Sequence, residues 1–250
     1  MKKILLFIAA IFLQIHVFAT HERAGEITYR HIEGLTYEIT ITTYTYAPSP
    51  ADRPELEIKW GDGTSSIIPR DNYIDLTPFI RRNIYIGSHT FSGPATYTIS
   101  LEDPNRNYGI INIPNSVNIP FYIETQLVIN PFLGNNNSVV LLNPPLDYGC
   151  VDRLYVHNPG AYDPDGDSLS YKLVQCKGAG GLPIPGFEFP QASNSFSIDP
   201  VTGDLVWDKP VLQGEYNVAF IIEEWREGQR IGYVTRDLQR KIIACANNPP

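Results

Sequence analysis

The 250-residue chain contains 19 Lys and Arg residues against 27 Asp and Glu residues, which gives a formal net charge of −8. An acidic chain without clusters of basic side chains is a poor candidate for binding nucleic acid. Charged residues make up only 18% of the sequence, whereas Tyr, Pro and Gly number 15, 21 and 19. This composition is typical of strands joined by turns, so we predict an all-β protein that binds no nucleic acid.

The N-terminus has the pattern of a secretory signal. Lys2 and Lys3 precede an apolar run over residues 4–18, and a small residue, Ala19, follows. A membrane-spanning helix needs about 20 apolar residues, so this run is short for a span, and no later stretch is apolar enough to cross a bilayer. We therefore predict a signal peptide at residues 1–19 and an exported mature chain, extracellular or at the cell surface, without a transmembrane segment.

The first half of the mature chain alternates between apolar and polar side chains. Residues 35–46 show the clearest alternation and are rich in β-branched and aromatic side chains, which predicts a strand. The turn Glu33-Gly34 joins it to a preceding strand over residues 27–32. Further strands are predicted at residues 56–60 and 97–101, and within residues 110–129, where two prolines favour an edge strand.

Two motifs in this half carry a resemblance. One is Trp60-Gly61-Asp62-Gly63-Thr64, and the other begins at Ser88-His89-Thr90-Phe91 and leads into the strand at residues 97–101. They resemble the W-G-D-G-T turn and the H-T-F/Y-x-x-P-G-x-Y strand entry of the PKD domain, with the order of Gly93-Pro94 inverted. PKD domains are extracellular immunoglobulin-like sandwiches, so the resemblance implies a β-sandwich for the first half.

A change in composition marks a domain boundary. Residues 131–145 contain a polar Gly- and Asn-rich loop and end in Asn143-Pro144-Pro145. We predict a PKD-like domain over residues 20–145, a second domain over residues 146–246 and a linker over residues 247–250.

The second half also reads as a β-sandwich. About seven short strands in roughly 100 residues are the signature of that architecture. A turn at residues 199–203 forms a hairpin from its flanking strands, and a turn at residues 226–229 joins the last two strands. The strands are predicted at residues 154–156, 169–175, 196–198, 204–207, 216–225 and 233–244.

Three carboxylates lie close together between the first two of these strands. Asp163, Asp165 and Asp167 alternate with Pro164 and Gly166, which predict a tight turn. Like charges at this spacing repel, and calcium, a hard cation that prefers oxygen ligands, relieves the repulsion. The three aspartates are therefore the candidate calcium ligands. The alternative is a hydrophilic turn without an ion, since the residues are usual turn formers and the spacing is not that of an EF-hand.

The three cysteines allow one disulfide and leave one thiol over, which an exported protein permits. If the acidic turn joins two antiparallel strands, Cys150 before the first strand and Cys176 after the second lie at the same end of the domain. We therefore predict a Cys150–Cys176 disulfide, with Cys245 at the opposite end.

A second resemblance covers the whole mature chain. Residues 162–171 and 196–207 resemble the D-x-D-G-D-x-L-x-Y and I-D-x-x-T-G-x-L motifs of cadherin-like and related immunoglobulin-like repeats. With Asn143-Pro144-Pro145 and residues 112–116 and 224–226, the chain looks like the start of gliding-motility-associated surface proteins of bacteria. The resemblance implies calcium bound by the acidic turn, partners among neighbouring domains or surface proteins, and a role in gliding or surface adhesion.

No pattern of catalytic residues stands out. The sequence lacks a Gly-x-Ser-x-Gly elbow, a His-Glu-x-x-His helix and a Gly-rich phosphate loop, and His89 is accounted for by the PKD-like motif. Trp60, Trp207 and Trp225 are interpreted as buried sandwich residues. We predict a non-catalytic structural or adhesive module. The alternative is a carbohydrate-binding module, in which exposed aromatic side chains of the Tyr-rich strands stack on glycans.

Overall fold

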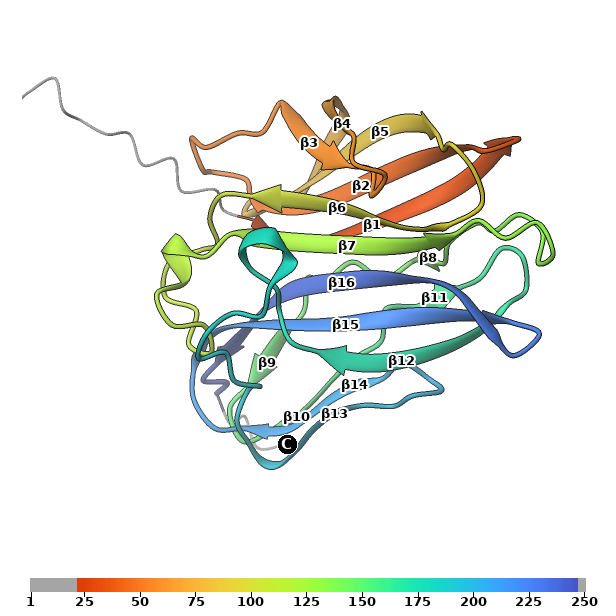
Figure 1. The fold of residues 1–250 in the computed structure, drawn as a ribbon. Helices are drawn as coiled ribbons and strands as arrows, with labels where there is room; N and C mark the ends of the chain where they lie inside the picture. Colours follow the sequence, from red (N-terminus) through yellow and green to blue (C-terminus); the bar gives the residue numbers. More distant parts are fainter. Residues whose placement is uncertain (1–21, 247–250) are drawn as a thin grey trace, which may run out of the picture.

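The computed structural model describes residues 22–246, and these residues form sixteen strands and two short 3-10 turns (Figure 1). The predicted all-β class is confirmed. The predicted signal peptide at residues 1–19 and the linker at residues 247–250 lie outside the described residues. Within residues 22–246 no helix has the length and apolarity that a membrane span requires.

The strands of the first half are β1 (Glu22–Glu33), β2 (Thr36–Tyr46), β3 (Glu55–Lys59), β4 (Ser65–Thr77), β5 (Ile80–Thr90), β6 (Thr96–Asp103) and β7 (Phe121–Val128). Those of the second half are β8 (Val140–Leu141), β9 (Tyr148–Cys150), β10 (Leu154–His157), β11 (Ala161–Tyr162), β12 (Ser168–Val174), β13 (Ala192–Ile198), β14 (Leu205–Pro210), β15 (Gly214–Arg226) and β16 (Gln229–Ile243). The 3-10 turns are η1 (Ser116–Asn118) and η2 (Ala179–Gly181).

The first half packs around a core of aliphatic and aromatic side chains. The alternation predicted for residues 35–46 is observed in β2, where Tyr37, Ile39 and Ile41 are buried. Side chains from the other six strands complete the core, and Trp60, which follows β3, is buried within it as predicted. The seven strands of the first half therefore form one continuous run of hydrogen-bonded neighbours around a single apolar interior.

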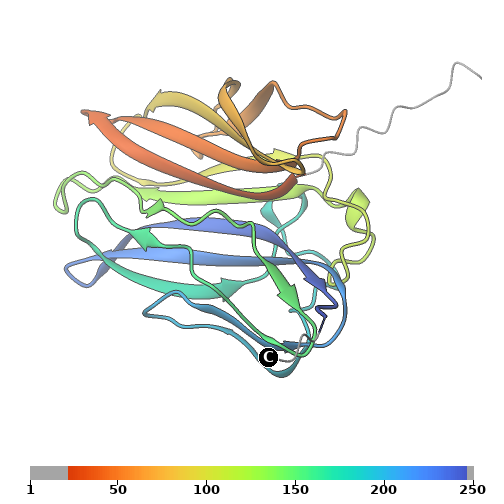
Figure 2. The ribbon, with the colours of Figure 1, turned by 180° about the vertical axis from the view of Figure 1, so that it is seen from behind.

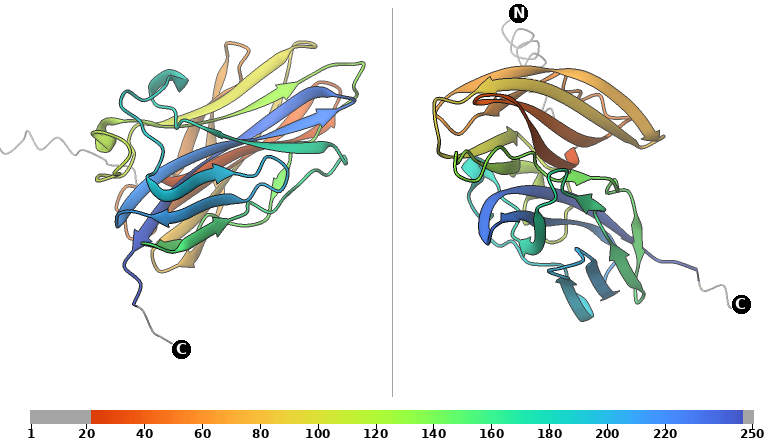
Figure 3. Two further views of the ribbon diagram at one scale, coloured as in Figure 1. Left: turned by 90° about the horizontal axis from the view of Figure 1, so that it is seen from below. Right: turned by 90° about the vertical axis from the view of Figure 1, so that its right-hand side faces the viewer.

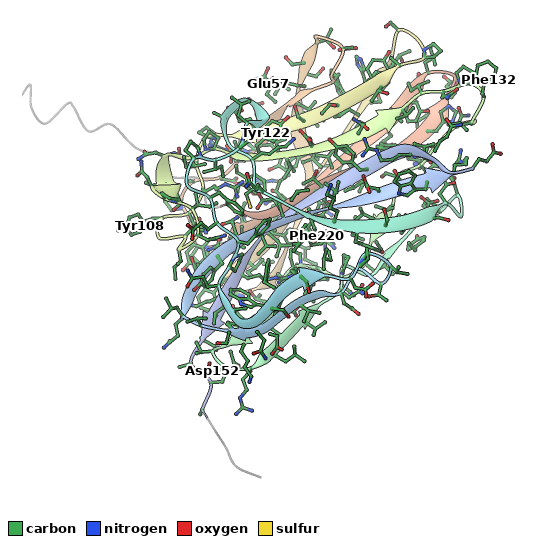
Figure 4. All side chains as sticks on the ribbon, turned by 60° about the horizontal axis from the view of Figure 1, so that its bottom comes forward. Glu57, Tyr108, Tyr122, Phe132, Asp152 and Phe220 are labelled. Carbon is green, nitrogen blue, oxygen red and sulfur yellow. A yellow bond between two sulfur atoms is a disulfide. The ribbon has the colours of Figure 1, made fainter. Side chains whose placement is uncertain are left out.

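The second half forms a sandwich against a smaller sheet. The strands β16, β15 and β12 lie on one side, and β10, β14 and β13 lie on the other. Between them lie Phe220, which Figure 4 places near the centre, and Leu205, while Trp207 is buried at one end against Tyr216. Seen from behind, the segment that carries β8, β9 and β11 runs in front of the blue strands β15 and β16 (Figure 2).

Strand pairing crosses the boundary predicted at residue 145. The largest sheet has eleven strands in the order β1-β2-β5-β4-β3-β6-β7-β16-β15-β12, with β9 also pairing with β16. β16 pairs with β7 along Gly232–Val234 and with β1 at Ala24, opposite Leu238. The two halves lie one above the other (Figure 3) and share β16 as a hydrogen-bonded strand. Their independence as domains stays a prediction.

The disulfide joins Cys150 to Cys245, with the two Cα atoms 5.5 Å apart, and the predicted Cys150–Cys176 pairing is wrong. That pairing assumed that the acidic turn joins two neighbouring antiparallel strands. Instead β11 pairs with β8, whereas β12 pairs with β15. β9 runs parallel to the end of β16 with Cys150 opposite Ile243, which brings Cys245 alongside. Cys176 is a buried free thiol.

Candidate metal centre

The acidic turn connects β11 to β12 and is held together by Asp163. The Oδ1 atom of Asp163 accepts the backbone N–H of Asp165 at 2.8 Å and that of Asp167 at 3.1 Å. Gly166 has a φ of +85°, a conformation that favours glycine, and its N–H donates to the carbonyl of Asp163 at 3.3 Å. The residues therefore adopt the tight turn that the Pro and Gly positions predicted.

The three predicted ligands come together in this turn. One carboxylate oxygen from each of Asp163, Asp165 and Asp167 lies within 4.8 Å of the others. Asp165 also accepts two hydrogen bonds of 2.7 Å from Asn137, one from its backbone N–H and one from its side-chain amide. The Asn-rich loop before the predicted boundary is thus folded onto the acidic turn.

Arg226, the last residue of β15, supplies a fixed positive charge to this cluster. Its Nε and Nη2 atoms donate to the two oxygens of Asp167 at 2.8 and 2.6 Å, and Nη2 lies 3.5 Å from an oxygen of Asp165. Its Nη1 atom donates to the carbonyls of Leu133 and Asn135 at 2.8 and 2.9 Å. The guanidinium therefore ties the Asn-rich loop to the turn and neutralises part of its charge.

A fourth carboxylate, Glu224 of β15, lies beneath the turn and was not among the predicted ligands. It is fully buried, and its Oε2 atom accepts the hydroxyl of Tyr29 at 3.1 Å and the amide of Asn136 at 3.4 Å. Its Oε1 atom and the buried Oδ2 atom of Asp163 have no hydrogen-bond donor within the described part of the chain. The two carboxyl groups are close enough that the charge of Asp163 acts on the pKa of Glu224.

The sequence contains a partial signal for Glu224. We expected Glu223 and Glu224 to face opposite sides of a strand, and the structure agrees, since Glu223 pairs with Arg230 at 2.8 Å while Glu224 is buried. Alternation alone does not show which of the two glutamates is buried, or which residue of the neighbouring strand lies beside it. That depends on the β12–β15 register, in which Leu169 lies opposite Glu224, and this register is set by long-range packing.

Electrostatics favour a proton or a cation between these groups. Burial raises the pKa of Glu224 well above its ordinary value, and the neighbouring Asp163 raises it further by its charge and by a hydrogen bond. Burial and the charge of Glu224 likewise raise the pKa of Tyr29. A proton on Glu224 allows it to donate to Asp163 and removes the repulsion between two buried charges.

The donor set fits a hard divalent cation. The three candidate ligands are carboxylate groups, and the Oδ2 atom of Asp163 is buried without a donor among the described residues. When ionised, the four carboxylates carry four negative charges against the single charge of Arg226. A cation held by Asp163, Asp165 and Asp167 would supply the missing positive charge and remove the need for a proton on the neighbouring Glu224.

The PKD-like turn has a structural arrangement. His89 stacks on Trp60 with ring centroids 4.6 Å apart, and its Nε2 atom lies 2.7 Å from a carboxylate oxygen of Asp62. Asp62 also accepts the N–H and hydroxyl of Thr64, and the hydroxyl contact is the largest cause that lowers the pKa of Asp62 to about 2. Asp62 thus caps the turn, and His89 is fixed against a buried ring.

Fold and site together define an all-β protein with a partly buried carboxylate cluster where its two halves meet. A scan against models of known protein families found no match, and a search of curated proteins found no similar chain.

Proposed function

We propose that this chain is a non-catalytic structural and adhesive module, exported to the bacterial cell surface and stiffened by calcium at Asp163, Asp165 and Asp167. The observation that supports it most is the position of the cluster. Segments distant in sequence converge there: Tyr29 of β1, the loop at residues 133–137, the acidic turn and the end of β15.

The loop beside the cluster is also bonded to β1. The carbonyl of Tyr29 accepts the N–H of Ser138 at 2.9 Å, while its N–H donates to the hydroxyl of Ser138 at 2.8 Å. The side-chain oxygen of Asn137 accepts the N–H of His31 at 2.9 Å. A cation that fixes the acidic turn would therefore stiffen the contact between β1 and β15, and such stiffness suits a module that holds a binding surface away from the cell.

Export and a role in gliding or adhesion rest on the predicted signal peptide and on the resemblance to gliding-motility-associated surface proteins. Partners would be neighbouring domains or other surface proteins. Protease added to intact cells of the source organism should degrade the chain and spare a periplasmic marker. Survival of the chain until the cells are lysed would contradict placement at the surface.

Calcium binding is tested by thermal unfolding in EDTA, in millimolar calcium and in millimolar magnesium. A ligand that binds only the folded state raises the unfolding midpoint by mass action, so we expect a rise specific to calcium. Asp163→Asn should abolish most of that rise, whereas Asp71→Asn on the exposed surface of β4 should preserve it. Equal calcium responses of the parent and Asp163→Asn would rule out the metal centre.

A carbohydrate-binding function is the second proposal. It is favoured by a recess lined with aromatic side chains, remote in the fold from the acidic turn and formed largely by the ends of other strands.

A further inference from the structure

A recess of about 490 Å³ opens where the ends of β2 and β5 meet β9 and the end of β16. Its size is within the range typical of small-ligand sites. Ile80 and Ile243 contribute its aliphatic lining, and its remaining residues are aromatic or cationic. The recess therefore combines apolar surface with positive charge in a chain whose net charge is −8.

Three aromatic side chains line the recess. The rings of Tyr46 and Phe79 are parallel within 3°, with centroids 6.3 Å apart, as in an offset-stacked pair. Phe79 is 56% exposed, and Tyr148 of β9 is 55% exposed. Exposed rings that line one concavity offer faces on which a flat apolar surface can stack.

Two cations accompany the rings. The Arg23 guanidinium lies 5.3 Å from the Tyr46 ring centroid, and its nearest carboxylate oxygen, on Glu215, is 3.7 Å away. This is a long ion pair, and the other oxygen of Glu215 accepts the amide of Gln239 at 2.5 Å. The buried Nε atom of Arg23 has no acceptor among the described residues, and Lys241 forms no ion pair within residues 22–246. Lys241 can therefore receive an anionic group, and Arg23 can receive one in addition to its long pair with Glu215.

We propose that this recess binds an acidic glycan, a chain of sugar rings that carry carboxylate groups. The C–H faces of sugar rings stack on Phe79 and Tyr148, while the carboxylates pair with Arg23 and Lys241. The inference names the adhesive ligand of the proposed surface module and in that sense rests on it, but it makes no use of the metal centre.

The charge pattern separates an acidic glycan from other anions. A nucleic acid presents a dense row of phosphates that an acidic chain with two local cations does not match.

A second recess, of about 190 Å³, lies over β7, β15 and β16. Its charged groups are already satisfied by one another, because Glu124 accepts from both Lys177 and Tyr233 at 2.6 Å.

The wall formed by β9 is fixed by covalent and backbone contacts. Tyr148 lies opposite Lys241 in the parallel pairing of β9 with β16, and the Cys150–Cys245 disulfide closes the same pair of segments. Aromatic and cationic groups are thus held at a set spacing before a ligand arrives, which lowers the entropic cost of binding.

The test is titration calorimetry of the purified exported chain with oligogalacturonate, oligoalginate and a hyaluronan fragment, against a neutral hexose oligomer of equal length. The buffer contains EDTA, so that calcium does not cross-link the uronates. We expect at least one acidic oligomer to bind at least tenfold more tightly than the neutral one. Its affinity should fall as salt is added, because exposed charges are screened.

Phe79→Ala and Tyr148→Ala should each weaken this binding at least tenfold, and Lys241→Gln should weaken it severalfold and flatten its salt dependence. Phe132→Ala, at the 96% exposed tip of another loop (Figure 4), and Lys172→Gln on β12 should bind like the parent. Circular dichroism confirms that each variant is folded. Failure of all three acidic oligomers, equal binding of the neutral one, or unchanged affinity in Phe79→Ala and Tyr148→Ala would overturn the proposal.

The metal centre is tested separately from this recess. Glycan binding in EDTA without a calcium response of the unfolding midpoint would support the recess and reject the metal centre. A calcium response of the unfolding midpoint without glycan binding would support the metal centre and reject the recess as a glycan site.

Discussion

The carboxyl group of Glu224 is fully buried, yet only one of its two oxygens accepts a hydrogen bond from a donor within residues 22–246. Its pKa is higher in the folded chain than in the unfolded one. The folded state therefore keeps a proton that the unfolded state loses above the ordinary Glu pKa. Stability falls as pH rises from that value toward the folded pKa, by about 1.4 kcal/mol per pH unit.

Glu224→Gln should remove this pH dependence, because the amide can replace the protonated carboxyl without titrating. In EDTA, we expect the stability of the variant relative to the parent to increase as pH is raised from 5 to 8, measured by urea unfolding. Glu223→Gln, at the neighbouring position on the opposite face, is the matched control and should show no such trend. A constant difference between Glu224→Gln and the parent would mean that Glu224 does not hold the proton.

The guanidinium of Arg226 supplies positive charge to the acidic cluster. Arg226→Gln removes the positive charge and the paired donors to Asp167, and it should cost about 1–3 kcal/mol in EDTA, a range that allows for the partial exposure of Arg226 to solvent. The loss should be smaller in calcium, because the ion neutralises Asp165 and Asp167. Arg30→Gln, which breaks the exposed Arg30–Glu38 pair, should cost under about 1 kcal/mol in both buffers. Urea unfolding of the two variants and the parent, in EDTA and in calcium, gives these losses of stability. An equal loss for Arg226→Gln in both buffers would argue against a nearby cation.

At the scale of elements, β16 carries charged side chains into the interior. Arg236 is fully buried and pairs with Glu26 of β1 at 2.9 Å, and Arg106 pairs with Asp237 at 2.6 Å. Removal of one member of a buried pair leaves an uncompensated charge, so Glu26→Gln should destabilise the chain by about 3–5 kcal/mol. Glu38→Gln, which also removes a partner of an arginine but at the surface, should cost under about 1 kcal/mol. Similar losses in urea unfolding would show that the junction of β1 and β16 is open to water.

The disulfide fixes β9 to the end of β16. The Cys150–Cys245 bond spans 95 residues, and in the chain-entropy model its loss costs about 4–5 kcal/mol. The double variant Cys150→Ser, Cys245→Ser should lose about this much free energy of unfolding relative to the parent, as measured by urea unfolding.

In the parent, the thiol of Cys176 should resist alkylation until the chain is unfolded, because burial raises its pKa and blocks access. Peptide mapping that finds Cys176 in the disulfide would contradict this connectivity.

Some elements were predictable from the sequence and others were not, for physical reasons. Alternation identified β2 and β12, because each has one face turned toward a core. β4 gave no such signal, since most of its side chains are exposed and it contains Pro69, and backbone pairing with β3 and β5 holds it in the sheet. The acidic turn was evident from local residues. Glu224 and the disulfide depended on which strands pair across the whole chain, and local patterns do not fix that pairing.

At the scale of the whole molecule, the strand β16 connects the two halves through backbone hydrogen bonds. It pairs with β15 along most of its length and also with β7 and β1, so its removal would expose hydrogen-bonding edges on both sides. The second core also includes Ala24, Tyr44 and Ile80, which come from strands of the first half. The interior of the second half is therefore incomplete without strands of the first half, whereas the first core draws only on residues 27–129.

We therefore expect residues 20–250 to unfold in one cooperative transition, with calorimetric and van't Hoff enthalpies that agree. A fragment that ends at residue 145 would lack β16, expose the edge of β7 and leave Glu26 without Arg236. It should show weak near-ultraviolet circular dichroism and rapid proteolysis. Two separate transitions, together with a stable, protease-resistant fragment, would show instead that the halves are independent domains and that their shared strand contributes little to folding.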